Sequence, residues 1–316
     1  MRTVGAPDDV AMKAAAEAVA RHLAPTPVLA APSLGEGVVL KLETFQPTGS
    51  FKVRGALAAV SAAVGREPTV RLVAASAGNH GLGVAYAAAR LGARATVVVA
   101  ENASVAKVRA LEGYRVTLVR HGATFDEAEA YALDLADRQG GHYLSPYNDP
   151  DVIAGQATVA AELAVQVPDA ATYVVPVGGG GLVSGISLAT EGGPLRIVGV
   201  EPEASAAMSA ALLGRDLPVH GAETIADGLA GGIEAGSVTV AIARRRPVEM
   251  VTVGEAALAA AVRALAFECG LVAEGAGAAA TAAVRSGLVA AGAGPTVVLV
   301  TGRNIAPRLL SSILGG

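Results

Sequence analysis

The chain has 316 residues, of which 52% are hydrophobic and 16% are charged, and its 24 Lys and Arg against 28 Asp and Glu give a formal charge of −4. This composition excludes a disordered chain, and the length predicts about two domains around a large buried core. The mildly acidic balance offers no electrostatic footprint for nucleic acid or for an anionic membrane surface. The single cysteine, Cys269, can form no internal disulfide, so we expect a reducing, cytoplasmic setting and a small-molecule partner.

In chain order, short β-branched runs alternate with longer alanine-rich segments. Strands are predicted at 38–42, 71–76, 95–100, 114–119, 172–177, 196–200, 249–253 and 296–300. Helices are predicted at 54–65, 80–91, 104–112, 124–139, 155–166, 255–269 and 275–286. Runs that are apolar on both faces and are separated by helices are typical of parallel strands covered on both sides. We therefore predict an α/β fold with open, doubly wound sheets.

Residues 170–190 carry no charge over a length that could span a membrane. Four consecutive glycines, a proline and several hydroxyl groups in this stretch argue against a spanning helix. At the N-terminus, Asp8 and Asp9 precede any apolar run, which argues against a secretory signal. The sequence therefore predicts no membrane association.

Ligands of open α/β sheets bind at the carboxyl ends of the strands, in the loops that lead to helices. Four loops after predicted strands are rich in glycine or polar residues: QPTGSFKVRG at 46–55, SAGNHG at 76–81, VGGGGLVSG at 177–185 and TGRN at 301–304. We expect the functional residues in these four loops.

Lysine is rare in this chain, because 20 of the 24 basic residues are arginines. Arginine keeps its proton and forms no imine, so any amine chemistry must use Lys13, Lys41, Lys52 or Lys107. Lys52 follows a Thr-Gly-Ser turn that ends in a helix N-cap, which places it in a first helical turn. The partial positive charge of a helix N-terminus disfavours an ammonium ion and should lower the pKa of Lys52.

The four glycines at 178–181 follow a predicted strand and precede a helix that starts near Leu182. Backbone amides and a helix N-terminus at this point predict a cradle for a phosphate group. The spacing G-x-G-x-x-G fails from every possible start, and no G-x-x-x-x-G-K-[ST] occurs. A monophosphate ligand fits this loop better than a dinucleotide or a nucleoside triphosphate does.

Together, the candidate nucleophilic lysine, the monophosphate cradle and the Asn-His loop resemble the fold type II family of pyridoxal 5′-phosphate (PLP) enzymes, in its serine/threonine dehydratase and serine racemase branch. The resemblance covers about residues 26–304. It implies two open doubly wound sheets, as in the tryptophan synthase β-like fold, with the active site between a large and a small domain. We accordingly predict a large PLP-binding domain of residues 1–69 and 146–316 and a small domain of residues 70–145.

The resemblance also implies roles for individual residues, with Lys52 as the Schiff-base lysine and Phe51 flanking the cofactor ring. SAGNHG resembles the loop that holds the substrate carboxylate, and Asn79 would also reach the phenolic oxygen of PLP. VGGGGL resembles the phosphate loop, ETIADGL resembles a segment that lines the site near Gly228, and Thr301 would face the pyridine nitrogen. The implied cofactor-binding residues are Phe51, Lys52, Asn79, Gly178, Gly179, Gly180, Gly181, Leu182, Gly228 and Thr301, and the implied substrate-binding residues are Ser76, Ala77, Gly78, Asn79 and His80.

The chain departs from the branch at its last motif, which usually reads Ser-Gly-Gly-Asn and here reads Thr-Gly-Arg-Asn at 301–304. Arg303 stands where the branch has glycine, so the resemblance does not predict the local backbone or the pocket shape. Thr301 keeps a hydroxyl group, and a neutral hydroxyl makes the cofactor a weaker electron sink than a carboxylate would, which favours elimination over transamination.

Two further positions separate the possible activities. Racemisation needs a second acid/base opposite the lysine, and the racemases of this branch have serine where this chain has Ala77. The branch often binds a divalent cation through positions that correspond to Glu201, Ser205 and Ala207. The second carboxylate is missing here, so we predict no tight metal site.

The sequence thus predicts a PLP-dependent ammonia-lyase that dehydrates and deaminates L-threonine, L-serine or both to a 2-oxo acid and ammonia. The alternatives are a serine racemase, another β-substituted amino-acid lyase such as a 3-hydroxyaspartate dehydratase, and a PLP-binding regulatory homologue without activity. A NAD-dependent dehydrogenase is disfavoured by the failed glycine spacing. The resemblance favours a homodimer or homotetramer.

Overall fold

In the computed structural model, the structure describes residues 4–215, 223–290 and 292–315. Contacts divide the chain into two compact units, of which unit 1 comprises Met1–Ala6, Pro25–Phe51 and Ala157–Gly316, and unit 2 comprises Pro7–Ala24 and Lys52–Gln156. The boundary near residue 156 falls inside helix α6 (Pro150–Gln166). Across the described residues, no helix combines the length and the apolar character needed to cross a membrane.

Unit 2 is built on a parallel sheet with the strand order β5-β4-β3-β6 among the described residues. Its strands are β3 (Arg71–Ala75), β4 (Arg94–Val99), β5 (Thr117–Arg120) and β6 (His142–Tyr143). Its helices are α1 (Asp9–Ala20), α2 (Lys52–Arg66), α3 (Asn79–Leu91), α4 (Val105–Glu112) and α5 (Phe125–Arg138).

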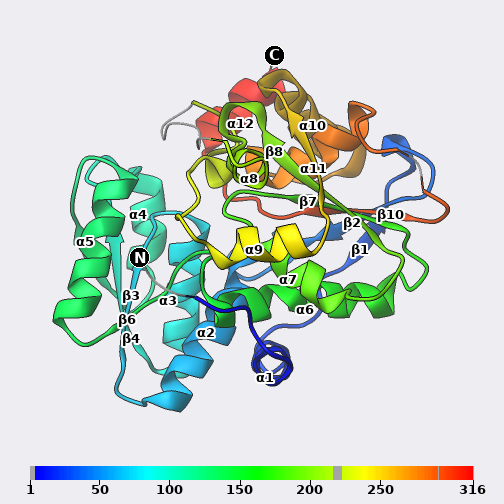
Figure 1. The fold of residues 1–316 in the computed structure, drawn as a ribbon. Helices are drawn as coiled ribbons and strands as arrows, with labels where there is room; N and C mark the ends of the chain where they lie inside the picture. The colour runs from blue at the N-terminus through cyan, green and yellow to red at the C-terminus, as the bar shows by residue number, and fades with distance from the viewer. Residues whose placement is uncertain (1–3, 216–222, 291, 316) are drawn as a thin grey trace. The chain divides into compact units, whose positions relative to one another are not determined.

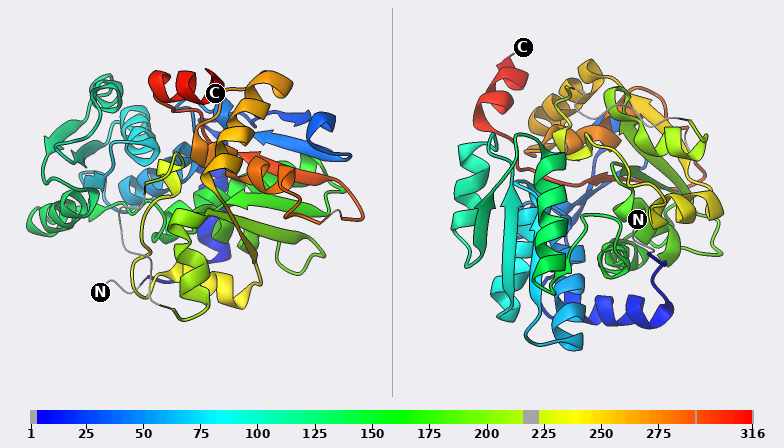
Figure 2. Two further views of the ribbon diagram at one scale, coloured as in Figure 1. Left: turned by 90° about the horizontal axis from the view of Figure 1, so that it is seen from above. Right: turned by 60° about the vertical axis from the view of Figure 1, so that its left-hand side comes forward.

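The helices of unit 2 cover both faces of its sheet, as Figures 1 and 2 show. Val73 and Ala75 of β3 pack against alanines of α5, whereas Leu72 and Ala74 pack in the cluster that holds α2 and α3. Side chains of a strand alternate between its two faces, so an unbroken apolar run buries both. This packing explains why strand β3 is apolar without alternation.

Unit 1 holds a second sheet, with the order β1-β2-β10-β7-β8-β9 in the described part of the chain. Its strands are β1 (Val28–Ala30), β2 (Val38–Leu42), β7 (Thr172–Pro176), β8 (Arg196–Pro202), β9 (Glu249–Val253) and β10 (Thr296–Val300), and β1 alone among these pairs antiparallel. Its α-helices are α7 (Gly181–Ala189), α8 (Ala207–Leu212), α9 (Val238–Arg245), α10 (Glu255–Cys269), α11 (Gly275–Arg285) and α12 (Pro307–Gly315). Short 3-10 helices occur at η1 (Pro32–Leu34), η2 (Glu43–Phe45), η3 (Glu203–Ser205) and η4 (Asp227–Leu229).

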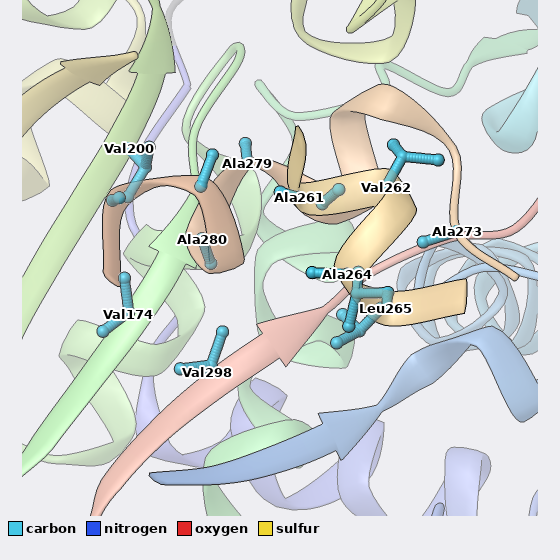
Figure 3. Close-up of a cluster of buried hydrophobic side chains, with 14 of the residues drawn as sticks. Val174, Val200, Ala261, Val262, Ala264, Leu265, Ala273, Ala279, Ala280 and Val298 are labelled. Carbon is cyan, nitrogen blue, oxygen red and sulfur yellow. The ribbon is translucent and has the colours of Figure 1, made fainter. Parts of the chain in front are cut away.

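The core of unit 1 lies between this sheet and helices α10 and α11. Val174, Val200 and Val298 point from three strands toward the alanines of α11, including Ala280 (Figure 3). Alanine side chains allow a helix to approach a sheet closely, and the valines fill the remaining space. The carboxyl ends of the parallel strands, where the polar loops begin, are thereby held in fixed positions.

The α/β fold with two open, helix-covered sheets confirms the predicted fold class. The compact units differ in their bounds from the predicted domains, because residues 7–24, 52–69 and 146–156 belong to the unit that holds the smaller sheet. The physical reason is that α2 packs against α3 and α1 packs against α2. The domain ranges 1–69 with 146–316 and 70–145 stay a prediction.

Candidate functional site

Lys52 is the first residue of α2, as predicted from the turn before it. Burial lowers the pKa of Lys52 to about 8 from its ordinary 10.5. The direction is the one expected from the sequence, and its cause in the structure is the loss of solvation on burial. The Lys52 amine donates a hydrogen bond to the Pro146 carbonyl over 2.9 Å. An amine must have such a lowered pKa to act as a nucleophile or proton acceptor near neutral pH.

The loop in front of Lys52 is attached to the end of β10 within unit 1. Phe51 N–H donates to the Thr301 carbonyl (3.1 Å), and Arg303 N–H donates to the Gly49 carbonyl (2.9 Å). The Asn304 side-chain amide donates to the Thr48 carbonyl at 2.8 Å. These bonds fix the backbone that enters α2.

Gly49 is the residue on which this attachment depends. Its φ is +76°, and a Cβ there would lie 2.4 Å from Asn304 Oδ1. Glycine is therefore required both by the left-handed backbone and by the close approach of Asn304. Sequence reasoning placed Gly49 in a turn but assigned Asn304 no role, because their contact joins two segments that are distant in the sequence.

The segment 76–81 consists of a loop up to Gly78 and the start of α3, which begins at Asn79. The Ser76 hydroxyl accepts the Gly78 N–H at 3.1 Å, which closes a tight turn around Ala77. No described side chain caps the N-terminus of α3 at Gly78, so its first-turn amides can bind an anion. A carboxylate is an anion of suitable size and charge.

His80 is buried and hydrogen-bonds through Nε2 to the Leu144 carbonyl at 2.9 Å. Burial, and then the charge of Lys52, lower the pKa of His80 to about 4. His80 is therefore neutral at physiological pH, and Nε2 carries the proton because a carbonyl only accepts. Leu144 is two residues from Pro146, so His80 and Lys52 both bind the segment 144–146.

The same segment is fixed at its far end by the start of α6. Asp149 accepts the N–H groups of Asp151 (2.9 Å) and Val152 (3.1 Å), and the Ser145 hydroxyl accepts the Asn148 N–H (3.1 Å). The Pro146 carbonyl is thus a rigidly placed acceptor for the Lys52 amine. Sequence reasoning did not find this acceptor, because it is a backbone atom.

The glycine loop of unit 1 connects β7 to α7, which begins at Gly181. Gly180 is the N-cap with φ +87°, and no side chain among the described residues caps this helix. A Cβ at Gly178 would lie 3.3 Å from the Leu229 backbone, so the segment next to Gly228 borders this loop. A helix start of this kind, with small residues around it, is suited to an anion.

Glu201, the remaining carboxylate of the predicted cation positions, is wholly buried. It accepts the N–H groups of Met208 (2.6 Å) and Ser209 (3.0 Å) and the Ser209 hydroxyl. Burial raises the pKa of Glu201, although these hydrogen bonds favour its charged form. Glu201 thus caps α8, and the described residues hold no group of three or more His, Cys, Asp or Glu suited to a metal ion.

The predicted site residues fall into two sets. Unit 2 brings together Lys52, Ser76, Ala77, Gly78, Asn79 and His80, and unit 1 holds Phe51, Gly178, Gly179, Gly180, Gly181, Leu182, Gly228 and Thr301. Within unit 2, the pKa of His80 is lowered first by burial and then by the nearby charge of Lys52. Within unit 1, Phe51 is hydrogen-bonded to Thr301.

Comparison with known proteins shows a match of residues 19–302 to the family described as pyridoxal-phosphate dependent enzymes. The chain is 39% identical to an L-threonine ammonia-lyase of Thermotoga maritima over 89% of its own length and 70% of that protein. It resembles the structure of maize serine racemase with a TM-score of 0.89 and 27% identity, covering 97% of this chain and 96% of that one. It also resembles the processed form of threonine deaminase isoform 2 from Solanum lycopersicum, with a TM-score of 0.86, 29% identity and coverage of 99% and 91%.

Proposed function

Because this chain belongs to the family of pyridoxal-phosphate dependent enzymes, we propose that it is an ammonia-lyase that converts L-threonine, L-serine or both to the 2-oxo acid and ammonia. The observation that carries the proposal is the poorly solvated Lys52 amine, whose pKa of about 8 suits proton transfer near neutral pH. The 39% identity to an L-threonine ammonia-lyase supports the substrate class.

The residues present fit PLP. Lys52 is an amine of lowered pKa that can bond to an aldehyde carbon, and the uncapped start of α7 suits a phosphate group. Thr301 is a buried neutral hydroxyl next to the backbone that binds Phe51. We propose that Lys52, Asn79, Thr301, Phe51, Gly228 and the loop 178–182 hold the cofactor. When bound, PLP withdraws electrons from Cα of the amino acid, which acidifies the Cα proton and lets a β-hydroxyl group leave.

In the proposed reaction, the substrate carboxylate binds to the loop that begins at Ser76 and to the start of α3, whose first residue is Asn79. The neutral Lys52 amine takes the Cα proton, while the Pro146 carbonyl accepts one of its hydrogens and orients its lone pair. His80 stays neutral and holds the backbone of Leu144. The Lys52 ammonium then returns this proton to the β-hydroxyl group, which leaves as water. The unsaturated amine that remains is released and hydrolyses with a second water molecule to a 2-oxo acid and ammonia.

Elimination is proposed over racemisation because of the residue at position 77. The methyl group of Ala77 exchanges no proton, and the neighbouring Ser76 hydroxyl is engaged by the Gly78 N–H. Position 77 therefore supplies no donor for a proton returned from the face opposite Lys52, whereas a serine at this position would. We expect D-serine formation from L-serine to be slow or absent, despite the similarity to maize serine racemase.

We further propose that the protein acts in the cytoplasm as a homodimer or homotetramer. The absence of a cysteine pair favours a reducing compartment. The family resemblance of the sequence supports a homo-oligomer. Size-exclusion chromatography with light scattering would measure the mass of the assembly.

The proposal is tested by assaying 2-oxo acid and ammonia with the purified, PLP-loaded protein. The substrates are L-threonine, L-serine, D-serine and 3-hydroxyaspartate, and we expect turnover of L-threonine, L-serine or both. Lys52→Ala should abolish turnover and Asn79→Ala should reduce it less, whereas Lys13→Ala, an exposed lysine on α1, should retain it. Selective turnover of 3-hydroxyaspartate would replace the proposed substrate, and rapid D-serine formation would replace the proposed reaction.

A further inference from the structure

Thr239 of α9 lies against the glycine loop of unit 1, and its side chain is fully buried. Its hydroxyl donates to the Gly179 carbonyl at 2.8 Å. The Ser237 hydroxyl lies 2.8 Å from Thr239 Oγ1, and because the Thr239 proton goes to Gly179, Ser237 is the donor in that pair. A chain of two hydrogen bonds therefore runs from the start of α9 to one peptide group of the loop, and each bond polarises the next.

This contact determines which way the loop amides face. A trans peptide directs its C=O and its N–H to opposite sides, so the Gly180 N–H points away from Thr239 once the Gly179 carbonyl is bound to it. The Gly180 carbonyl accepts the Ser184 N–H at 2.9 Å and so faces along α7. The left-handed φ of +87° at Gly180 joins these two orientations. The Gly180 N–H, just before the first turn of α7, is thereby held pointing away from Thr239.

The surroundings leave the loop little freedom to rotate. A Cβ at Gly180 would lie 2.4 Å from Met208 Cε and 3.1 Å from Thr239 Cβ. Helix α9 packs against both α7 and α8, and Figure 1 shows α9 beside α7. Met208 and Thr239 both support the loop, but Thr239 supplies the polar contact that selects one orientation of its peptide group.

From these contacts we infer that Thr239 is a positioning residue for the phosphate group of PLP, which it orients through the peptide group between Gly179 and Gly180 without touching the phosphate. The inference rests on the proposed function only in assigning PLP to the loop. It adds a requirement for a hydroxyl group at position 239, which neither the glycine motif nor the helix N-terminus predicts.

The test compares PLP with pyridoxal, which lacks the phosphate group, as ligands of the cofactor-free full chain. Thr239→Val keeps the size and the β-branch but leaves the Gly179 carbonyl without its donor. We expect it to weaken PLP binding about tenfold while pyridoxal binding stays unchanged. Thr239→Ser should restore the wild-type ratio of the two affinities. In the PLP-loaded protein, the ³¹P resonance should shift in the valine variant and not in the serine variant.

The matched control is Thr190→Val at the other end of α7, where the hydroxyl donates to the Ile186 carbonyl at 2.9 Å. It removes the same kind of bond from the same helix and should leave the ratio unchanged. If Thr239→Val does not fold, Thr239→Ala takes its place. An unchanged ratio, or an equal loss of both affinities, overturns the inference.

The outcomes separate the inference from the proposed function. The proposed function alone would be refuted if the wild type prefers PLP over pyridoxal and Thr239→Val loses this preference, but the wild type turns over no hydroxy amino acid. Turnover of L-threonine or L-serine together with an insensitive ratio would refute the role of Thr239 alone.

Discussion

Replacing Lys52 by methionine should stabilise the cofactor-free protein at neutral pH, and this gain should disappear as the pH rises. Burial holds the pKa of Lys52 near 8, against 10.5 for a solvated lysine. Below pH 8 the folded chain must keep an ammonium ion in a poorly solvated position, whereas the unfolded chain does not. Methionine has a similar length and no charge, so Lys52→Met removes this penalty.

The magnitude follows from the two pKa values. They lie about 2.5 pH units apart, and each unit corresponds to about 1.36 kcal/mol, so the full penalty is about 3 kcal/mol. It is fully present below pH 8 and declines between pH 8 and 10.5, because the unfolded chain binds more protons in that range. The free energy of unfolding of the wild type should therefore rise relative to Lys52→Met by about 2.5 kcal/mol between pH 7 and pH 10.

The assay is urea denaturation of both cofactor-free proteins at pH 7, 8, 9 and 10, with the linear extrapolation applied to each curve. The lost hydrogen bond to Pro146 adds an offset but leaves the dependence on pH to the lysine. Lys13→Met on the exposed face of α1 is the control and should run parallel to the wild type. Parallel curves for wild type and Lys52→Met would refute a lowered pKa at Lys52.

Three further outcomes are expected. His80→Leu should lower kcat about tenfold with little change in KM, because the Leu144 carbonyl loses its donor. His80→Gln should recover most of the lost kcat. A leucine variant with the kcat of the wild type would show that His80 has no such role. Gly49→Ala should lower the free energy of unfolding by well over 1 kcal/mol, because the added Cβ would meet Asn304. Gly92 has the same left-handed backbone with nothing within 4 Å of such a Cβ, so Gly92→Ala should cost about 1 kcal/mol. Equal losses of stability in the two variants would show that the contact with Asn304 does not matter. EDTA or added Mg²⁺ should leave 2-oxo acid formation unchanged, because Glu201 is taken up by the amides of α8, and activation by Mg²⁺ would show that a cation competes for this carboxylate.

Most of the fold could be predicted from periodicity, because buried parallel strands and alanine-rich helices give strong local patterns. Helices α8, α9 and α12 and strands β1 and β6 were not predicted. Strand β1 has three residues and forms only by antiparallel pairing with β2, and β6 has two. The strand predicted from residue 114 begins at Thr117, because the Tyr114 and Val116 amides close tight turns. Gly113, at the end of α4, marks the first of these turns in the sequence.

The site was predictable to the extent that its residues form local motifs. The turn before Lys52, the glycine loop and the start of α3 are all legible from neighbouring residues. The contacts of Asn304, Pro146 and Thr239 are not, because each joins segments that are distant in sequence. The burial that lowers the pKa of Lys52 could not be predicted for the same reason, since burial depends on the packed fold rather than on the position of a helix end.

The proposed function depends on Lys52 as the residue that binds the cofactor. The chain has four lysines to which PLP could attach. Borohydride reduction of the PLP-loaded protein, followed by digestion and mass spectrometry, would locate the attached group. We predict a pyridoxyl phosphate adduct on Lys52 and none on Lys13, Lys41 or Lys107. An adduct on another lysine, or a chain that takes up PLP without any adduct, would contradict it.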